Sequence, residues 1–360
     1  DPDPGVEEAL ASQDVLLGDL PGPLPAGEET RLGDRVVLVF PTSLDTFPER
    51  AEFSERFSDL STLVTLGEDN DDNIAQIAVR ARTDREMLQR LLRIYGYYDA
   101  DVVQTVAGVQ PGSEASAKDV TVRFDIAPGT RYRFGTIALG NLEATGTDFP
   151  YLRANFGIWP RDPLSSDAVV RGVADLGVAL GETGYAFARV GEPDLLVDHR
   201  REEGDLTLPV DTGGKYRFGA ITSELPRFLP AWHLHEIARF RSGDLFRQSE
   251  VEDLRRAVIA TGLVASVTVT PRETLAPQGG KPGEVALDVG MAPAPLRTVA
   301  GAIGYDSGDG FRLEGSWEHR NLFPPEGMLR VRGIAGTREQ LAGVTFRRNN
   351  FKGRDQVLTL

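Results

Sequence analysis

Histidine side chains are the first residues in this chain whose spacing could hold a metal ion. His233 and His235 stand two residues apart in "AWHLHEI", and His199 and His319 lie far from them in the sequence. Two imidazoles at that spacing share a face only in a strand, whereas a loop or the start of a helix turns them apart. We therefore expect no metal site at this pair.

Two acidic stretches could supply oxygen ligands for calcium. "GEDNDDN" places Asp69, Asp71 and Asn73 at alternating positions, as the loop of an EF-hand does. The positions that should hold glycine and a bidentate glutamate hold Ile74 and Arg80, so a solvated acidic loop before the next helix is the better interpretation. The later stretch "YDSGDG" also carries two aspartates, but a tight turn between two strands explains it without a metal.

The sequence lacks the motifs of nucleophilic catalysis and cofactor binding that would indicate an enzyme. The chain has no cysteine, which removes thiol nucleophiles, thiolate metal sites and disulfides together. We find no Ser–His–Asp set, phosphate-binding loop or dinucleotide fingerprint in a strand–turn–helix context. The sequence therefore predicts no catalytic residues, no cofactor and no metal. The net charge of −15, from 39 basic and 54 acidic residues, argues against nucleic acid as the main partner.

An internal repeat is the strongest organising signal. "GTRYRFGTIAL" (129–139) and "GGKYRFGAITS" (213–223) share Tyr-Arg-Phe-Gly, and the flanking apolar positions also match. In each copy the aromatic pair and the following isoleucine fall on opposite faces of a strand. We therefore predict a β-bulge at each glycine, with the tyrosines near junctions between modules and the isoleucines in the cores. The predicted junction residues are Tyr132, Phe134, Gly135, Tyr216, Phe218 and Gly219.

Helical periodicity recurs before, between and after the two copies. The helices are expected to stop at Gly96, Gly184 and Gly262, each followed by a strand and by a second strand that closes on a Pro/Gly turn. The sequence thus predicts an α+β fold with three tandem modules, each a three-stranded sheet with two helices. The predicted modules span 35–129, 130–213 and 214–294, the first strand lies at 34–40, and a disordered lead-in rich in Pro, Gly and acidic residues occupies 1–34.

From residue 295 to 360 the pattern changes to short alternating strands joined by turns. In "FRLEGSWEHR", Phe311, Leu313 and Trp317 alternate with charged residues, which indicates an antiparallel meander with one apolar and one charged face. Such faces suit a barrel wall between lipid and a polar lumen, and they suit equally a soluble sheet with one wet face. The first strand is rich in Gly and Ala, which would either weaken its seam with a neighbour or merely accommodate curvature. Its residues are Thr298, Val299, Ala300, Gly301, Ala302, Ile303, Gly304 and Tyr305.

With three α+β modules followed by an alternating meander, the chain resembles the outer-membrane assembly proteins that carry polypeptide-transport-associated (POTRA) modules, and among them the TamA-like factors. The stretches that carry the resemblance are "LLRIYGYYDADV", "GETGYAFARV", "GGKYRFGAI", "LRRAVIATGLVASVTV" and "GAIGYDSGDGFRLEGSW". The resemblance covers 35–360. Two features depart from the family pattern: a long insert in the first module, and a meander with room for about four or five strands where family barrels have about sixteen.

The resemblance implies a non-enzymatic factor that assembles or translocates outer-membrane proteins, autotransporters among them. Its modules would bind unfolded client strands by β-augmentation and would dock a TamB-like inner-membrane partner, while its transmembrane β-barrel would contact lipid and open laterally at the first strand. It implies an outer-membrane location with the modules in the periplasm of a Gram-negative bacterium. Unclosed strands cannot span a bilayer, so the sequence would be a fragment, or the barrel would be completed by further residues.

Two other classes of protein remain open on the sequence. A soluble periplasmic scaffold or adaptor would have the same modules, with a small closed β domain in place of the barrel. A secreted enzyme or carbohydrate binder would need a pocket with convergent polar groups, and the sequence shows none. Since the first residue is Asp1 and not Met, we also expect a processed or trimmed N-terminus.

Overall fold

The computed structural model describes residues 27–65, 74–107, 120–307 and 310–360, and the chain separates into two compact units. One unit comprises Asp1–Thr136, Trp159–Val169 and Leu195–Leu206; the other comprises Ile137–Ile158, Val170–Asp194 and Thr207–Leu360. The division runs through the predicted second module, 130–213, whose residues are shared between the two units.

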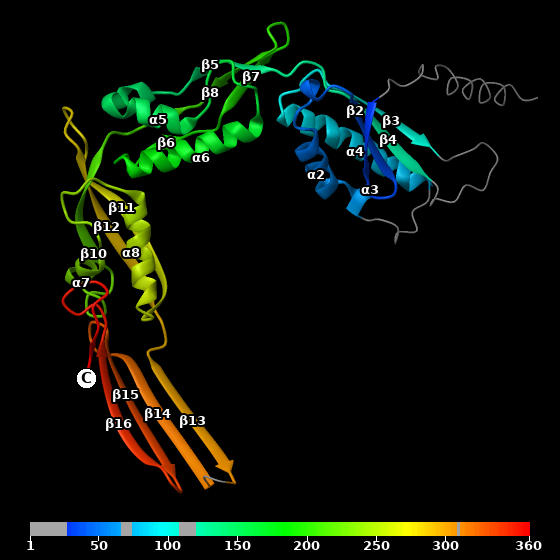
Figure 1. Cartoon of the computed structure of the whole chain (residues 1–360). Coiled ribbons are helices and arrows are strands. Elements are labelled where there is room, and N and C mark those ends of the chain that lie inside the picture. The colour runs from blue at the N-terminus through cyan, green and yellow to red at the C-terminus, as the bar shows by residue number, and fades with distance from the viewer. Residues whose placement is uncertain (1–26, 66–73, 108–119, 308–309) are drawn as a thin grey trace, which may run out of the picture. The chain divides into compact units, whose positions relative to one another are not determined.

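The first unit is built on the four-stranded sheet β1-β2-β4-β3, in which β2 runs parallel to β4 and the outer strands are antiparallel to their neighbours (Figure 1). Apolar residues of α4 at helical spacing, including Ile77, Ala81 and Leu88, pack with Phe53 and Phe57 of α2 against one face of this sheet. The elements are β1 (Gly27–Leu32), β2 (Val36–Pro41), η1 (Leu44–Thr46), α2 (Arg50–Leu60), α3 (Thr62–Thr65), α4 (Ile74–Ile94), β3 (Asp101–Ala107) and β4 (Thr121–Ala127).

Strand β1 corrects two sequence predictions: that the lead-in is disordered through residue 34, and that the first sheet has three strands. Gly27–Leu32 pairs antiparallel with β2 after a turn at Gly33, where φ is 60°. Because the segment has no fully buried side chain, it lacks the apolar pattern from which a strand can be predicted. It forms a strand because β2 presents an edge whose backbone groups need partners. The predicted opening strand at 34–40 is confirmed as β2.

A three-stranded sheet, β5-β8-β7, lies mainly in the first unit. Its strands are β5 (Arg133–Ala138), β7 (Asp194–Asp198) and β8 (Glu203–Thr207), and the neighbouring elements are η3 (Leu142–Asp148), α5 (Phe149–Phe156), α6 (Ser166–Glu182), β6 (Arg189–Val190) and β9 (Val210–Asp211). The predicted helix stop after α6 is present, since Gly184 has φ 102°, a value that favours glycine.

The second unit contains the sheet β10-β12-β11, with the same connection of strands as β2-β4-β3: the first strand is parallel to the third and the second is antiparallel to it. Its core stacks Phe218 of β10 on Phe240, with ring centroids 3.8 Å apart, and includes Leu254 and Val258 of α8. The elements are β10 (Tyr216–Ser223), α7 (Ala231–Ile237), α8 (Gln248–Ala260), β11 (Val264–Leu275) and β12 (Gly283–Pro293).

The C-terminal part of the second unit is a five-stranded antiparallel sheet in which neighbours in sequence are neighbours in space, so the predicted meander is confirmed (Figure 1). Its strands are β13 (Arg297–Asp306), β14 (Gly310–Phe323), β15 (Gly327–Gly336), β16 (Gln340–Arg348) and β17 (Leu358–Thr359). Among the described residues, none of the helices is both long and apolar enough to cross a membrane.

Candidate functional site: the repeated junctions and the strand edges

Main-chain hydrogen bonds hold the first Tyr-Arg-Phe-Gly stretch along the outer edge of β5. The N–H of Tyr132 donates to the carbonyl of Gly96 (2.9 Å), and the carbonyl of Tyr132 accepts from the N–H of Leu164 (2.8 Å). Two residues later, the N–H of Phe134 donates to the carbonyl of Asp162 (2.9 Å). Since Gly96 follows the end of α4, strand β5 begins against the terminus of the preceding helix.

The second stretch repeats these contacts one for one. The N–H of Tyr216 donates to the carbonyl of Gly184 (2.8 Å), and its carbonyl accepts from the N–H of Phe246 (3.1 Å). The N–H of Phe218 donates to the carbonyl of Asp244 (2.9 Å). In both copies, then, the repeat joins an opening strand to the glycine that ends the preceding helix, and a loop covers the strand's outer edge.

The bulge predicted for the second copy is confirmed. The register between β10 and β12 shifts between Phe218 and Ile221, across Gly219. The shift brings Ile221 into the core, where it is 3% exposed. In the first copy Ile137 is only half-buried, so the expectation of a core isoleucine is met by Ile221 and not by Ile137. The bulge at Gly135 stays a prediction.

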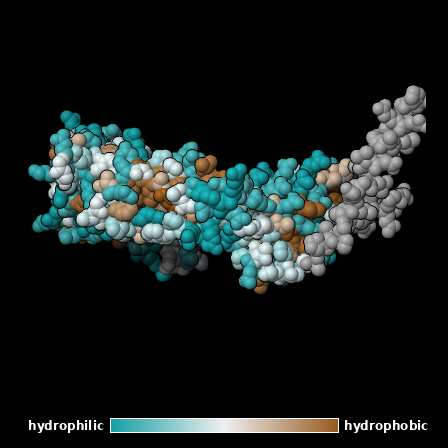
Figure 2. Space-filling model, turned by 90° about the horizontal axis from the view of Figure 1, so that it is seen from above, coloured by the Kyte–Doolittle hydropathy of each residue, from teal (hydrophilic) through white to brown (hydrophobic). Residues whose placement is uncertain are grey.

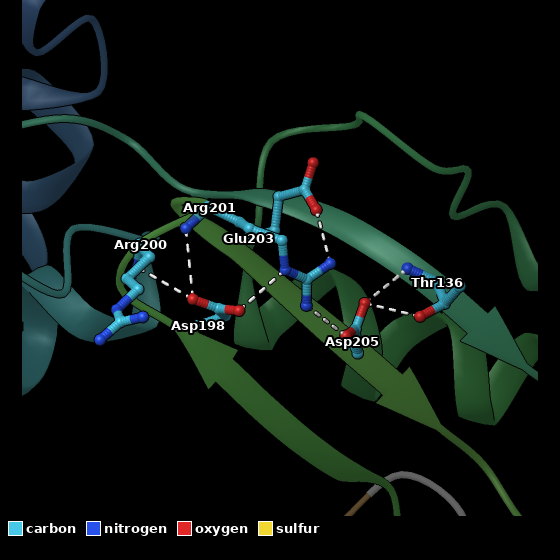
Figure 3. Close-up of polar contacts among 6 residues, drawn as sticks. All are labelled: Thr136, Asp198, Arg200, Arg201, Glu203 and Asp205. Carbon is cyan, nitrogen blue, oxygen red and sulfur yellow. Dashed lines mark hydrogen bonds and ion pairs between the residues drawn. The ribbon is translucent and has the colours of Figure 1, made fainter.

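Each glycine of the repeat faces an acidic side chain from the neighbouring strand. A Cβ added to Gly219 would lie 2.5 Å from Oε1 of Glu284, and a Cβ added to Gly135 would overlap Oδ1 of Asp205. Asp205 is held in that position by the N–H and hydroxyl of Thr136, at 2.7 and 2.6 Å (Figure 3). A side chain at either glycine would therefore have to displace a carboxylate from the space that it occupies.

Asp205 also belongs to a polar cluster at the β7–β8 turn (Figure 3). Arg201 donates to Asp205 (2.6 Å), to Asp198 (2.8 Å) and to Glu203 (3.0 Å). Hydrogen bonds from Thr136 and Arg201 to its carboxylate lower the pKa of Asp205 from 3.8 to about 2. Arg201 thus bridges three carboxylates, and this contact fixes the β7–β8 turn and the edge of β5.

The tyrosine hydroxyl of each copy donates to a carboxylate. The hydroxyl of Tyr216 lies 2.8 Å from Glu273, and that of Tyr132 lies 2.6 Å from Asp99 and 2.9 Å from Nδ1 of His199. Burial, followed by the hydrogen bond to Glu273, raises the pKa of Tyr216 to about 12. Conversely, the hydrogen bond from Tyr132 lowers the pKa of Asp99. These contacts allow a phenol to be buried with its hydroxyl satisfied, which is a positioning role.

Within the described residues, the sheet edges opposite the junctions are open. Strands β3, β7 and β11 each have a single strand neighbour, and β11 is 12 residues long. Pro271 lies within β11, and a proline is tolerated in an edge strand where its nitrogen faces away from the sheet. The residues of the same parity, Val267 and Val269, therefore turn their N–H and C=O groups toward the open edge.

Strand β13, the proposed first strand of a barrel, lies at the edge of the meander and pairs with β14. All of its residues are exposed, with Val299 at 78% and Ile303 at 81%. Val299 pairs with Trp317, and Ile303 pairs with Leu313, so these side chains share one face of the sheet. The predicted apolar face is therefore confirmed.

The opposite face of the meander carries cross-strand ion pairs. Glu314 lies 2.7 Å from Arg332, and Glu318 lies 2.5 Å from Arg330. The meander thus has one charged, mutually paired face and one exposed apolar face. The face of the molecule drawn in Figure 2 is mainly hydrophilic, and its hydrophobic residues lie in separate patches. Scattered apolar residues of this kind are normal on a protein surface.

A buried polar cluster, which no sequence pattern predicts, joins the turns of the meander to α7 and α8. Nε2 of His233, which is 1% exposed, lies 2.8 Å from Oε1 of Glu326 in the β14–β15 turn, itself 2% exposed. Asn350 donates to the same oxygen (2.7 Å), and Arg354 binds both carboxylate oxygens of Asp253 on α8. No local pattern links residues that are this far apart in the sequence.

The residues considered for metal binding do not converge in the described part of the chain. His233 and His235 lie in helix α7, as the helix-start interpretation predicted, and His235 accepts the N–H of Ile221 (3.3 Å). No group of three or more potential metal ligands was found in the described ranges. "GEDNDDN" lies wholly outside those ranges, and "YDSGDG" lies partly outside them.

The arrangement is that of an α+β protein in which small sheets in tandem precede an antiparallel meander. The chain is similar to BamA from Haemophilus ducreyi lacking POTRA domains 1–3 (15% identity, 61% of this chain, 40% of that chain, TM-score 0.48). It is also similar to Haemophilus influenzae BamA POTRA3–5 (18% identity, 75% of this chain, 99% of that chain, TM-score 0.35). A third similar structure is CdiB from Escherichia coli (14% identity, 78% of this chain, 47% of that chain, TM-score 0.31).

No protein-family model matches the sequence. The chain spans less than half the length of the Haemophilus ducreyi BamA and Escherichia coli CdiB chains that it matches. None of these TM-scores reaches 0.5.

Proposed function

We propose that this chain is a non-enzymatic, TamA-like factor for assembly or translocation of outer-membrane proteins. Three POTRA-type modules, at 35–129, 130–213 and 214–294, would lie in the periplasm of a Gram-negative bacterium. Residues 295–360 would form the first strands of a transmembrane β-barrel in the outer membrane. Autotransporters would be among the clients, and a TamB-like inner-membrane partner would dock at the N-terminal modules.

The observation that carries the proposal is the unequal treatment of the two edges of the sheet β10-β12-β11. Main-chain contacts from Gly184, Asp244 and Phe246 occupy the outer edge of β10, whereas β11 has no second strand neighbour among the described residues. An edge with unpaired N–H and C=O groups accepts an extended peptide and reads its backbone more than its sequence. This suits a factor that handles many client strands.

The two faces of the meander support the membrane part of the proposal. The apolar face that includes Val299 and Ile303 would contact lipid, and the paired charges of Glu314 and Arg332 would face a polar lumen. Strand β13 would form a seam with the last strand of the complete barrel. Its small residues leave few packed side chains at that seam, which favours lateral opening for client insertion.

Photocrosslinking from the open edge tests the proposal. A photoreactive side chain at Thr268, an exposed residue of β11, is expected to capture a urea-unfolded outer-membrane barrel protein diluted into the full chain. The matched control is the same group at Ile259 of α8, which is 41% exposed in the same sheet-and-helix unit and lies on no strand edge. Equal capture at both positions, or at neither, would contradict docking at β11.

A proline substitution provides a second arm of the same experiment. Val269→Pro removes an outward N–H, as Pro271 already does, and is expected to reduce capture at Thr268. Thr270→Pro would instead remove a bond to β12 and is expected to unfold the local ladder. A Val269→Pro variant that keeps full capture would show that the client does not pair with this edge.

A further inference from the structure

Strand β1 is attached to the first sheet by its backbone, by two partly exposed ion pairs and by Leu32 at its end, which packs half-buried against the core. No side chain of β1 is fully buried, whereas five of the six residues of β2 are. Glu28 binds Arg50 and Glu29 binds Arg123 (2.6 Å), but the two glutamate side chains are 61 and 59% exposed. Ion pairs of this kind each contribute about 0–1 kcal/mol, so apart from the half-buried Leu32 the side chains add little to the retention of β1.

Arg50 is the unusual partner in this contact. It is 8% exposed, and two of its guanidinium nitrogens, Nε and Nη2, are buried without a hydrogen-bond partner among the described residues. Glu28 supplies the acceptor for its remaining nitrogen, Nη1. A buried cation with unsatisfied donors is costly, so β1 fills the space beside Arg50 but satisfies it incompletely.

The edge that β1 covers is highly apolar. The residues from Val36 to Phe40 are each at most 7% exposed, and a bare edge of this composition would pair with any available strand. From these contacts we infer that the outer edge of β2 is a docking site for an acidic extended strand of a partner protein, and that β1 is a displaceable guard over it.

The chemistry of the displacing strand follows from the register. It would run antiparallel to β2 and carry an acidic residue opposite Phe40, where Glu28 now lies. An Asp or Glu that engages Arg50 through two nitrogens would satisfy donors that Glu28 leaves unpaired. The inference rests on the proposed function only in that the partner is a protein handled by, or docked to, the N-terminal module.

A disulfide lock can hold β1 in place, because the chain has no cysteine of its own. The N–H of Val122 donates to the carbonyl of Arg35, so odd-numbered residues of β2 bond to β4. Val37 and its partner Arg31 on β1 are then a pair without mutual hydrogen bonds, with Cα atoms about 4.5 Å apart. Arg31→Cys/Val37→Cys is therefore expected to form a disulfide on oxidation.

The probe is a dye-labelled peptide with the sequence of 27–33, GEETRLG, added to the full chain at millimolar concentration because the tethered β1 competes at a comparable effective concentration. We expect it to bind the wild-type chain and the reduced Cys pair, and to lose at least about 10-fold in binding to the oxidised pair. A control peptide, GQQTRLG, is expected to bind at least about 10-fold more weakly, since each 10-fold corresponds to about 1.4 kcal/mol. Amide exchange in β1 should be about 100-fold faster than in β4.

Three results would overturn the inference: no peptide binding to wild type, equal binding to the oxidised lock, or β1 amides as protected as those of β4. Equal binding of the two peptides would overturn its acidic selectivity. Crosslinking of the client at Thr268 is measured in the wild-type chain, to which the peptide is expected to bind. Absence of peptide binding there with intact crosslinking refutes the docking site alone, and peptide binding without crosslinking refutes the proposed function alone.

Discussion

Gly96→Ala is the most direct test of how the junctions are built. Gly96 has φ 93°, where a residue with a Cβ is strained by about 1–3 kcal/mol. The added Cβ would also overlap the backbone carbonyl of Leu164, which cannot rotate away as a side chain can. Relief of that overlap would break the bonds of Tyr132 to Gly96 and Leu164, each of about 1 kcal/mol. The expected total is about 3–5 kcal/mol.

Gly184→Ala is a matched comparison, because Gly184 plays the same part in the second junction. Its φ is 102°, so the backbone strain is similar. Its Cβ would meet the end of the Leu245 side chain, at 2.7 Å from Cδ1, and a leucine can change rotamer. The expected cost is about 1–3 kcal/mol. Gly177→Ala in α6 meets no atom within 4 Å and is expected to stabilise the chain by about 0.5–1 kcal/mol.

Amide exchange measures these costs at each junction, since a chain with two compact units does not unfold as one two-state system. Gly96→Ala should speed exchange of the Tyr132 amide by about 100-fold or more, while the Tyr216 amide is unchanged. Gly184→Ala should speed exchange of the Tyr216 amide by a smaller factor and leave the Tyr132 amide unchanged. A larger effect from Gly184→Ala than from Gly96→Ala would refute the reasoning, because it would show that backbone overlap does not decide the cost.

Three further predictions concern side chains. Asp205, whose pKa falls from 3.8 to about 2 on folding, should contribute stability that is present above about pH 4 and is lost as the pH falls toward 2; Asp205→Asn should flatten the dependence on pH of the urea transition of the first unit in that window. Arg354→Ala should cost about 1 kcal/mol, after allowance for the partial exposure of its pair with Asp253, measured as earlier proteolytic release of the meander. Tyr216→Phe removes the hydrogen bond to Glu273 and should destabilise the second junction by about 1 kcal/mol, measured as faster exchange of the Phe218 amide.

Much of the local structure could be predicted from periodicity alone. The helix stops at Gly96 and Gly184 and the alternation through Phe311 and Leu313 all depend on residues near one another in the sequence, and the structure contains each of them. The bulge at Gly219 could be predicted for the same reason, because a change of side-chain parity is visible within one short stretch.

The missed features depend on contacts between residues distant in sequence. Strand β1 forms because of the edge of β2, and its own composition, with Glu28 and Glu29 in succession, resembles that of a disordered tail. The buried pair of His233 and Glu326 joins residues 93 positions apart. Periodicity reports which face of an element is buried; it does not report which edge is paired or which polar groups meet across an interface.

Edge pairing also explains the structural role of the Tyr-Arg-Phe-Gly repeat. A sheet of three strands has two edges, and both are open to non-specific pairing unless they are covered. In each copy the alternate residues Tyr and Phe turn their backbone groups to a glycine and a loop of the same chain, while their side chains are buried. In the second copy the register shifts across Gly219, and in both copies a carboxylate, that of Asp205 or Glu284, lies beside the glycine. One edge of the sheets that contain β5 and β10 is thereby closed by a local, repeated sequence. At the corresponding edge of β2 the cover is strand β1, which the inferred partner strand would have to displace.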